Sequence, residues 1–370
     1  MDEPGPGVLR RLLTNCAIGA AVVAGLLLFA ATGRDSATAA GGNGPRVALF
    51  IAGTLGDKSF NDSAARGIAT ARTRWNLRAR VIEGGYDPTR WEASLTDLAD
   101  GGDFDIVIAG TFATAPMVER LAPRYPEVRF IVYDAAVDAA RCRCGNVHSI
   151  LFRQNEGAYL AGWLAARLAG GPAHPGAAGV PAHVGVIGAM QIPVIDDFII
   201  GFSAGAKAAD ATVTVSRQYV NSFKDPAAAK EIAKAVYAQG ARVIFQAAGA
   251  SGQGVIEAAE EAQRYVIGVD SDQYAVYRAS HPEQARVIAT SVMKDVDVAL
   301  ERAIGAHIDH SLRYGSVDSI GLKEGGISLA RGSEVLRDAP AALLAELDAV
   351  RQRIVAGGIV VPSAFVAARP

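Results

Sequence analysis

The chain has 370 residues, of which 50% are hydrophobic and 20% charged, with a formal net charge of −2 and a pI near 6.3. This length suits two domains of ordinary size rather than one small domain. The balanced charge and the lack of basic runs argue against a nucleic-acid-binding protein, so we expect no polyanionic partner.

Residues 1–45 are predicted to be an export signal and polar linker rather than part of the fold. Arg10 and Arg11 form a basic start, residues 16–31 are apolar, and residues 37–39 read Ala-Thr-Ala, a suitable cleavage site. The apolar run is short for a membrane-spanning helix, and an uncleaved anchor is the alternative. We therefore expect an exported protein, either secreted or held at the outer face of the cell membrane.

The next part of the chain alternates apolar strands with helices, which predicts a parallel sheet covered by helices. Strands are expected at residues 47–51, 80–83, 105–109, 129–133 and 147–152, and helices at 59–75, 91–101, 115–125 and 155–168. Ser59 and Asp62 have the spacing of a capping box. Phe60 would then lie at the first helical position, beyond a strand end, where an aromatic side chain is often exposed or at a site.

Cys142 and Cys144 are the two cysteines left after cleavage of the signal. They are predicted to be an ordinary loop pair or a local disulfide. A metal site would need two more ligands at suitable spacing, and none lies nearby, so we expect no metal.

A Gly/Pro/Ala linker at residues 170–181 leads to a second α/β series. Strands are expected at residues 183–187, 213–216, 243–245, 266–269 and 284–291, and helices at 198–209, 227–239, 255–262 and 295–308. The whole chain is therefore predicted to form an α/β protein with two parallel sheets.

Residues 243–273 form a strand, a glycine loop, a helix and a second strand. The glycines follow the order G-x-x-G-x-G, which is neither the dinucleotide fingerprint nor a P-loop. Ligands of open α/β sheets bind beyond the carboxyl ends of the strands, and Phe245 and Asp270 lie at such ends. The loop by itself is equally typical of a tight turn from strand to helix.

Six sequence blocks point to a family when they are taken together in this order: GDKSFND, YVNSFKDPAAAKEIA, VIFQAAGASGQG, IGVDSDQ, SVMKDVD and GLKEGGISLA. They resemble the basic membrane protein family of ABC-transporter substrate-binding proteins, whose best-understood members are purine nucleoside receptor lipoproteins. The resemblance spans residues 47–330 and continues loosely to residue 362. The acylated cysteine of such lipoproteins is absent, because Thr32 stands in its place.

The resemblance implies a type I periplasmic-binding-protein fold, with two doubly wound Rossmann-like lobes and a ligand cleft between them. The N-terminal lobe is expected at residues 46–153 plus about 293–318, and the C-terminal lobe at 154–292 plus about 319–362. The implied function is to bind a purine nucleoside for an ABC importer, with permease and ATPase subunits as partners. We expect a monomer that is not an enzyme and has no catalytic residue, no cofactor and no metal.

The resemblance also assigns ligand-binding residues. Phe60 and Phe245 are expected to sandwich the base, Asp270 and Lys294 to hold the ribose hydroxyls, and Asp134 to face the base edge. The predicted set is completed by Asp57, Ser59 and Gly249. Without the family, Lys294 reads equally well as a solvated lysine at a helix start.

Two other functions stay open at this point. A membrane-anchored ligand sensor or regulator of the same family would retain the N-terminal segment. An enzyme acting on nucleosides or dinucleotides is disfavoured, because the dinucleotide fingerprint is missing and residues 270–272 alone do not make a metal site.

Overall fold

The computed structural model describes residues 43–170 and 181–365. Residues 1–42 of the predicted export signal and polar linker lie outside the described residues, as do residues 171–180 of the predicted Gly/Pro/Ala linker. Within the described part of the chain, no helix is both long and apolar enough to cross a membrane.

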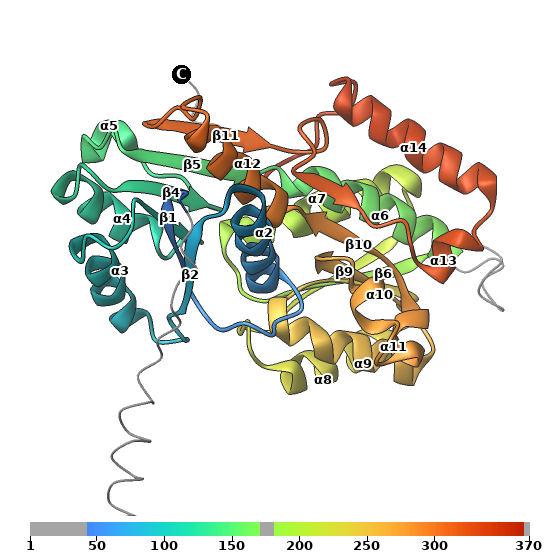
Figure 1. Cartoon of the computed structure of the whole chain (residues 1–370). Helices are drawn as coiled ribbons and strands as arrows, with labels where there is room; N and C mark the ends of the chain where they lie inside the picture. The colour runs from blue at the N-terminus through green and yellow to red at the C-terminus, as the bar shows by residue number, and fades with distance from the viewer. Residues whose placement is uncertain (1–42, 171–180, 366–370) are drawn as a thin grey trace, which may run out of the picture. The chain divides into compact units, whose positions relative to one another are not determined.

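The first sheet has six parallel strands in the order β11-β5-β4-β3-β1-β2. Its strands are β1 (Arg46–Ile51), β2 (Arg78–Glu83), β3 (Ile106–Gly110), β4 (Arg129–Tyr133), β5 (Val147–Phe152) and β11 (Ser316–Ile320). Its helices are α2 (Phe60–Trp75), α3 (Trp91–Asp100), α4 (Ala115–Leu121), α5 (Ala139–Cys142) and α12 (Val296–Ile308), and Figure 1 shows them around the sheet.

Alternating side chains of β1 show how this sheet is buried on both faces. Phe50 points toward α3, where its ring meets that of Trp91 edge-on at 6.4 Å. Leu49 points to the opposite face, in the core cluster that contains Ile68 of α2. Burial on both faces is what an uninterrupted apolar strand in a parallel sheet requires.

The second sheet has the order β12-β10-β9-β8-β6-β7, and all its strands are parallel except β12. Its strands are β6 (His183–Gly188), β7 (Thr214–Tyr219), β8 (Val243–Ala247), β9 (Tyr265–Asp270), β10 (Ile288–Lys294) and β12 (Ile327–Leu329). The helices of this part are α6 (Gln154–Gly170), α7 (Pro193–Ala209), α8 (Pro226–Ala238), α9 (Gly252–Ala262), α10 (Gln273–Tyr277), α11 (Pro282–Val287), α13 (Glu334–Arg337) and α14 (Ala341–Val355). The predicted α/β class is confirmed.

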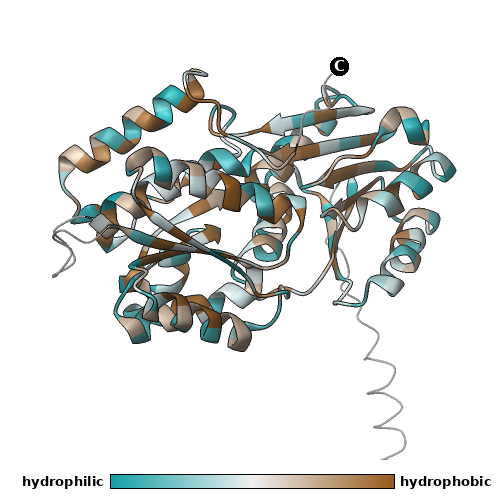
Figure 2. Cartoon of the chain, turned by 180° about the vertical axis from the view of Figure 1, so that it is seen from behind, coloured by the Kyte–Doolittle hydropathy of each residue, from teal (hydrophilic) through white to brown (hydrophobic). Residues whose placement is uncertain are grey.

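Hydropathy follows this layering. In Figure 2 the inner strands of both sheets are largely hydrophobic, whereas α14 carries hydrophobic and hydrophilic residues in turn. Only Leu347 and Ile354 of α14 are buried, so most of that helix is exposed to solvent.

Two predicted elements differ from the structure. Residues 284–291 were expected as one strand, but α11 extends to Val287 and β10 begins at Ile288. Pro282 at the first helical position favours the helix, and the β-branched run that forms the strand starts only later. The helix expected from residue 198 begins at Pro193 for the same reason.

Cys142 and Cys144, predicted to be a loop pair or a local disulfide, form a disulfide.

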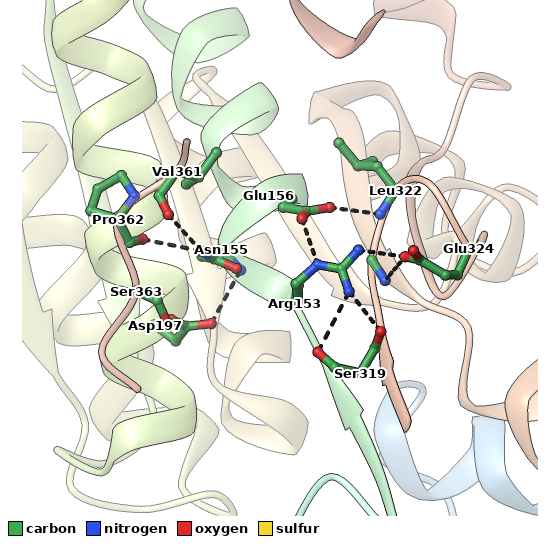
Figure 3. Close-up of polar contacts among 11 residues, drawn as sticks. Arg153, Asn155, Glu156, Asp197, Ser319, Leu322, Glu324, Val361, Pro362 and Ser363 are labelled. Atoms are coloured by element: carbon green, nitrogen blue, oxygen red, sulfur yellow. Dashed lines mark hydrogen bonds and ion pairs between the residues drawn. The ribbon is translucent and has the colours of Figure 1, made fainter. Parts of the chain in front are cut away.

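The chain passes between the two sheets three times, after β5, after β10 and after β11. We call residues 153, 295 and 321–326 the hinge. Arg153 joins two of these crossovers: its Nε donates to Glu156 Oε1 at 2.6 Å and its Nη1 to the carbonyl oxygen of Ser319 at 2.6 Å. It also pairs with Glu324, as Figure 3 shows.

Hydrogen bonds from two backbone N–H groups complete the hinge. Glu156 Oε2 accepts the N–H of Leu322 at 2.8 Å, and the N–H of Asp295 donates to the carbonyl oxygen of Gly326 at 3.0 Å. All three crossovers are therefore tied to one another by hydrogen bonds.

The C-terminal segment is held beside the hinge by a second polar group. Asn155 Nδ2 donates to the carbonyl oxygens of Val361 and Pro362, and Ser363 Oγ donates to Asp197 at 2.6 Å (Figure 3). Asp197 is fully buried, and burial raises the pKa of its carboxyl.

Candidate ligand-binding site

A cavity of about 440 Å³ lies where the carboxyl ends of strands from both sheets meet. Its lining comes from the segments that follow β1, β2, β3, β4, β6, β7 and β8, and from the last residues of β9 and β10. Parallel strands place their loops at one edge, which is where ligands of open α/β sheets bind. The volume falls in the range of small-molecule sites.

Three charged residues converge at the hinge end of this cavity. Lys294 is the last residue of β10 and is 2% exposed, and its Nζ donates to Asp134 Oδ1 at 2.6 Å. Asp270 is the last residue of β9, and its Oδ2 accepts a hydrogen bond from Ser59 Oγ at 2.5 Å. The reading of Lys294 as a solvated lysine is wrong.

These three groups keep unused hydrogen-bonding capacity. An ammonium has three N–H donors, and Asp134 is the one hydrogen-bond acceptor of Lys294 within residues 43–170 and 181–365. Over the same residues, Asp134 Oδ2 and Asp270 Oδ1 accept no hydrogen bond. Buried polar groups with unused hydrogen-bond donors or acceptors need a partner, which a polar ligand in the cavity would provide.

Burial dominates the electrostatics of the two carboxyls. It raises the pKa of Asp270 to about 6, against the opposing effects of Lys294 and the Ser59 hydrogen bond. It also raises the pKa of Asp134, again against the effect of Lys294. The ammonium of Lys294 therefore favours the charged form of both carboxyls, and the Ser59 hydrogen bond also favours that of Asp270.

Phe60 and Phe223 both line the cavity and are both partly exposed. Phe60 opens α2 after β1, and its ring stacks on that of Tyr133 with centroids 5.4 Å apart. Phe223 follows β7 of the second sheet and precedes Pro226, the first residue of α8. The two rings are thus supplied by segments of different sheets.

The loop before α2 is built differently from the predicted capping box. Ser59 makes no side-chain cap bond, because its hydroxyl is used by Asp270. Asp57 accepts the N–H groups of Ser59, Asn61 and Asp62 instead. Asp57 lines the cavity, whereas Ser59 is fully buried behind Asp270.

The structure places Phe245 differently from the prediction. Its ring does not line the cavity; it is fully buried, stacked on Phe202 at 5.5 Å and edge-on to Phe198 at 5.8 Å. Successive side chains of a strand alternate between faces, so Phe245 shares its face with Ala247, which lines the cavity, but it lies two residues earlier and packs in the core below the cavity. Its predicted contact with a base is corrected to a packing role.

Gly249 lies where the prediction puts it, in the cavity wall after β8. Its φ of +56° is in the left-handed region, and an added Cβ would come within 3.3 Å of the Phe223 ring. A side chain here would crowd the aromatic wall.

Sequence reasoning missed several residues of the cavity, of which Phe223 and Asn61 are the most informative. A usable signal for Phe223 was present, because it too is an aromatic residue between a strand and a helix start. The same rule had singled out Phe60. For Phe198, which lines the cavity from inside α7, the sequence held no comparable signal.

Backbone conformation also marks the site. Four cavity residues that are not glycine have positive φ: Thr111 (83°), Asp134 (59°), Asn221 (60°) and Asp270 (63°). Each follows or ends a strand. Such conformations cost energy and are concentrated at ligand clamps and other functional positions.

In the part of the chain that the structure describes, no group of three or more His, Cys, Asp or Glu residues is arranged to hold a metal ion. The cavity combines buried charged groups at one end with apolar and aromatic walls, in which Asn61, Asn221, Ser222 and Lys224 are further polar residues.

Comparison with known proteins agrees with this geometry. Residues 45–364 match the family model described as ABC transporter substrate-binding protein PnrA-like. Basic membrane protein A of Borreliella burgdorferi is 30% identical over 322 residues, covering 86% of this chain and 88% of the relative. The CD4+ T-cell-stimulating antigen of Listeria monocytogenes is 29% identical over 328 residues, covering 84% and 85%.

A crystal structure of an ABC transporter system solute-binding protein from Aeropyrum pernix has a TM-score of 0.75 to this chain. The two are 28% identical, and the match covers 86% of this chain and 93% of the other. The predicted periplasmic-binding-protein type of fold is thereby confirmed.

Proposed function

The chain belongs to the Bmp family of PnrA-like ABC transporter substrate-binding proteins, and on that premise we propose that its cavity binds a purine nucleoside. Members of this family bind a solute for an ABC transporter and are not enzymes. The observation that carries the proposal is the convergence of Asp134, Asp270 and Lys294, with free hydrogen-bonding capacity, at one end of a cavity flanked by Phe60 and Phe223.

The charged end suits a ribose. A vicinal diol offers two O–H donors and two acceptor oxygens, and Asp270 can accept while Lys294 donates. Hydrogen bonds to charged groups contribute about 1.5–3 kcal/mol each. Lys294 therefore serves both as the counter-ion of Asp134 and as a donor to the sugar.

The aromatic side chains suit a base. Stacking of a base on an aromatic ring contributes roughly 1–3 kcal/mol. Phe60 and Phe223 come from different sheets, so a base between them would join the two halves of the cavity. Asn61, whose Nδ2 donates to the carbonyl oxygen of Thr54, lies beside Phe60 and presents its remaining polar atom to the base edge.

The protein acts outside the cytoplasm and passes its ligand to the permease and ATPase subunits of an importer. Closure occurs between two lobes, residues 46–153 plus about 293–318 and residues 154–292 plus about 319–362. The hinge that joins the three crossovers is the structural basis for that motion.

The test is calorimetric titration of the protein with adenosine, inosine, adenine and ribose. Adenosine and inosine should bind with similar affinity, and adenine far more weakly, because a free base leaves the buried charges without partners. Equal affinity for adenosine and adenine would show that contacts with the sugar do not contribute to binding, and it would overturn the proposal. Binding of ribose as tight as adenosine would instead indicate a monosaccharide receptor.

Variants of the aromatic residues test the stacking role. Phe60→Ala and Phe223→Ala should each weaken adenosine binding by roughly 1–3 kcal/mol. Phe245→Ala is the matched comparison: it should lower the free energy of unfolding by about 3–5 kcal/mol, because it removes a core ring. Unchanged affinity in both cavity variants would contradict the base sandwich.

A further inference from the structure

The cavity has a buried charged end and an exposed end that is rich in apolar side chains and also carries Lys224 over the Tyr86 ring, and the topology orients the two ends. Asp134, Asp270 and Lys294 end or follow β4, β9 and β10, near the edges of the sheets where the crossovers lie. Tyr86 follows β2 and Met190 follows β6, toward the opposite edges. The charged residues thus lie at the hinge end, and we call the opposite end the mouth.

The exposed fractions of the lining side chains also distinguish the two ends. Lys294 and Asp270 are 2% and 7% exposed, whereas Phe112, Tyr86 and Met190 are 50%, 38% and 37% exposed. All five line the cavity. The hinge end is therefore closed off from water, and the mouth is open to it.

The mouth concentrates large apolar side chains in contact with water. Phe112 lies on the loop after β3 and Met190 on the loop before α7, so they come from different sheets. Ile192 and Val194 extend the same wall. Clustered exposed apolar side chains at the rim of a cavity are typical of a binding surface rather than of ordinary exterior.

We infer that the site selects purine nucleosides whose base carries an apolar substituent, which lies at the mouth between Phe112 and Met190. This rests on the proposed function, because it takes the sugar to be at the charged end. In a purine nucleoside the edge that carries N1, C2 and C6 is opposite the sugar. With the sugar at Asp270 and Lys294, that edge faces the mouth, so a group on the exocyclic N6 contacts the apolar wall.

The side chains present there suit such a group. An unsubstituted base leaves Phe112 and Met190 in water, whereas an apolar substituent removes both from it, which is favourable in proportion to the area covered. Methionine is unbranched and adapts to ligands of different shape. The subsite therefore selects for the hydrophobicity of the substituent more than for its shape.

The experiment compares adenosine with N6-benzyladenosine by calorimetry on the full chain. The wild-type protein should bind N6-benzyladenosine about tenfold more tightly than adenosine. Phe112→Ser and Met190→Gln should each bring the ratio of the two dissociation constants close to one. Val317→Ser is the control, because Val317 is 46% exposed on β11 and does not line the cavity, so its ratio should equal that of the wild type.

The outcomes separate the inference from the function on which it rests. Adenosine binding with equal or weaker binding of N6-benzyladenosine would overturn the inference and leave the nucleoside function standing. An advantage for the benzyl compound that persists in both mouth variants would also overturn it. Failure of both compounds to bind would refute the nucleoside function itself, and the inference with it.

Discussion

Different chemistry joins the two halves of the protein at the hinge and at the rim of the cavity. At the hinge, Arg153 bonds to Glu156 and to the backbone of Ser319 and pairs with Glu324. Two cation–π contacts also join the two halves, and we call them the rim contacts; of their four residues, Tyr86 and Lys224 line the cavity. Lys58, from the loop after β1, lies 4.3 Å from the centroid of the Tyr277 ring, and Lys224, after β7, lies 4.7 Å from that of Tyr86.

The rim contacts are reciprocal, because the segments that follow the strands of each sheet provide one lysine and one tyrosine. Lys58 is partly exposed and Lys224 is exposed, and a cation–π contact at an exposed site contributes only about 0.5–1 kcal/mol. The hinge bonds involve charged groups and fixed backbone atoms and are individually stronger. The contacts at the hinge are therefore stronger than those at the rim, which is consistent with the proposed opening of the cavity at the rim.

The largest effect is expected from Lys294→Met at the hinge end. The variant leaves the carboxyl of Asp134 buried without its ammonium, which should lower the free energy of unfolding by about 3–5 kcal/mol. Urea denaturation measures this. The double variant Lys294→Met with Asp134→Asn should recover part of the loss, because asparagine tolerates the positive φ and carries no charge. No recovery would show that the pair is not the cause.

The hinge network itself is tested by Arg153→Met. Its side chain is one-third exposed, so we expect a loss of about 1–2 kcal/mol in the free energy of unfolding rather than more. Arg167→Met is the matched control, since Arg167 pairs with Glu346 on an exposed surface and should change stability by about 0.5 kcal/mol or less. If the two variants cost the same, the hinge bonds would be no stronger than surface ion pairs.

Lowering the pH should weaken ligand binding at the hinge end and leave the rim contacts unchanged. Burial raises the pKa of Asp270 to about 6, and the groups facing it are Ser59, Asp57, Asp134 and Lys294. If the carboxylate accepts from the sugar, adenosine affinity falls as pH drops through that value, by about tenfold between pH 7 and pH 5. Calorimetry across this range measures it.

Asp270→Asn is the control for the pH effect, because it should bind weakly with little pH dependence in the same range. A raised pKa in the folded state also means that the ligand-free protein loses stability as pH rises from about 4 to about 6, since the folded form then binds more protons than the unfolded one. An affinity that is flat in the wild type would contradict a role for the Asp270 carboxylate.

The smallest effect is expected at the rim. Lys58→Met keeps the aliphatic stem and removes the cation, and Lys58 does not line the cavity. The dissociation rate of adenosine should rise about two- to fivefold, as a loss of about 0.5–1 kcal/mol predicts. Lys58→Arg retains a cation over Tyr277 and should release adenosine at the wild-type rate. If stopped-flow measurements showed equal dissociation rates for both variants, the contact between Lys58 and Tyr277 would have no role in retaining the ligand.

Local pattern was enough for much of the fold and part of the site. The alternation of apolar strands and helices predicts two parallel sheets, and the carboxyl ends of those strands are where Asp134, Asp270 and Lys294 lie. Phe60 at the first position of α2 was also predictable. These features depend on neighbours in the chain, and periodicity and turn residues report on neighbours.

Tertiary structure decided the rest. Ser59 binds Asp270 across 211 positions and Lys294 binds Asp134 across 160, so no local pattern could show that the hydroxyl is taken from its cap or that the lysine is buried. Phe245 and Phe223 both lie near strand ends, yet one packs against α7 and the other lines the cavity. Which of them meets a ligand depends on which face of the second sheet α7 covers. That is a matter of packing between segments distant in sequence, and it becomes definite only when the chain is folded.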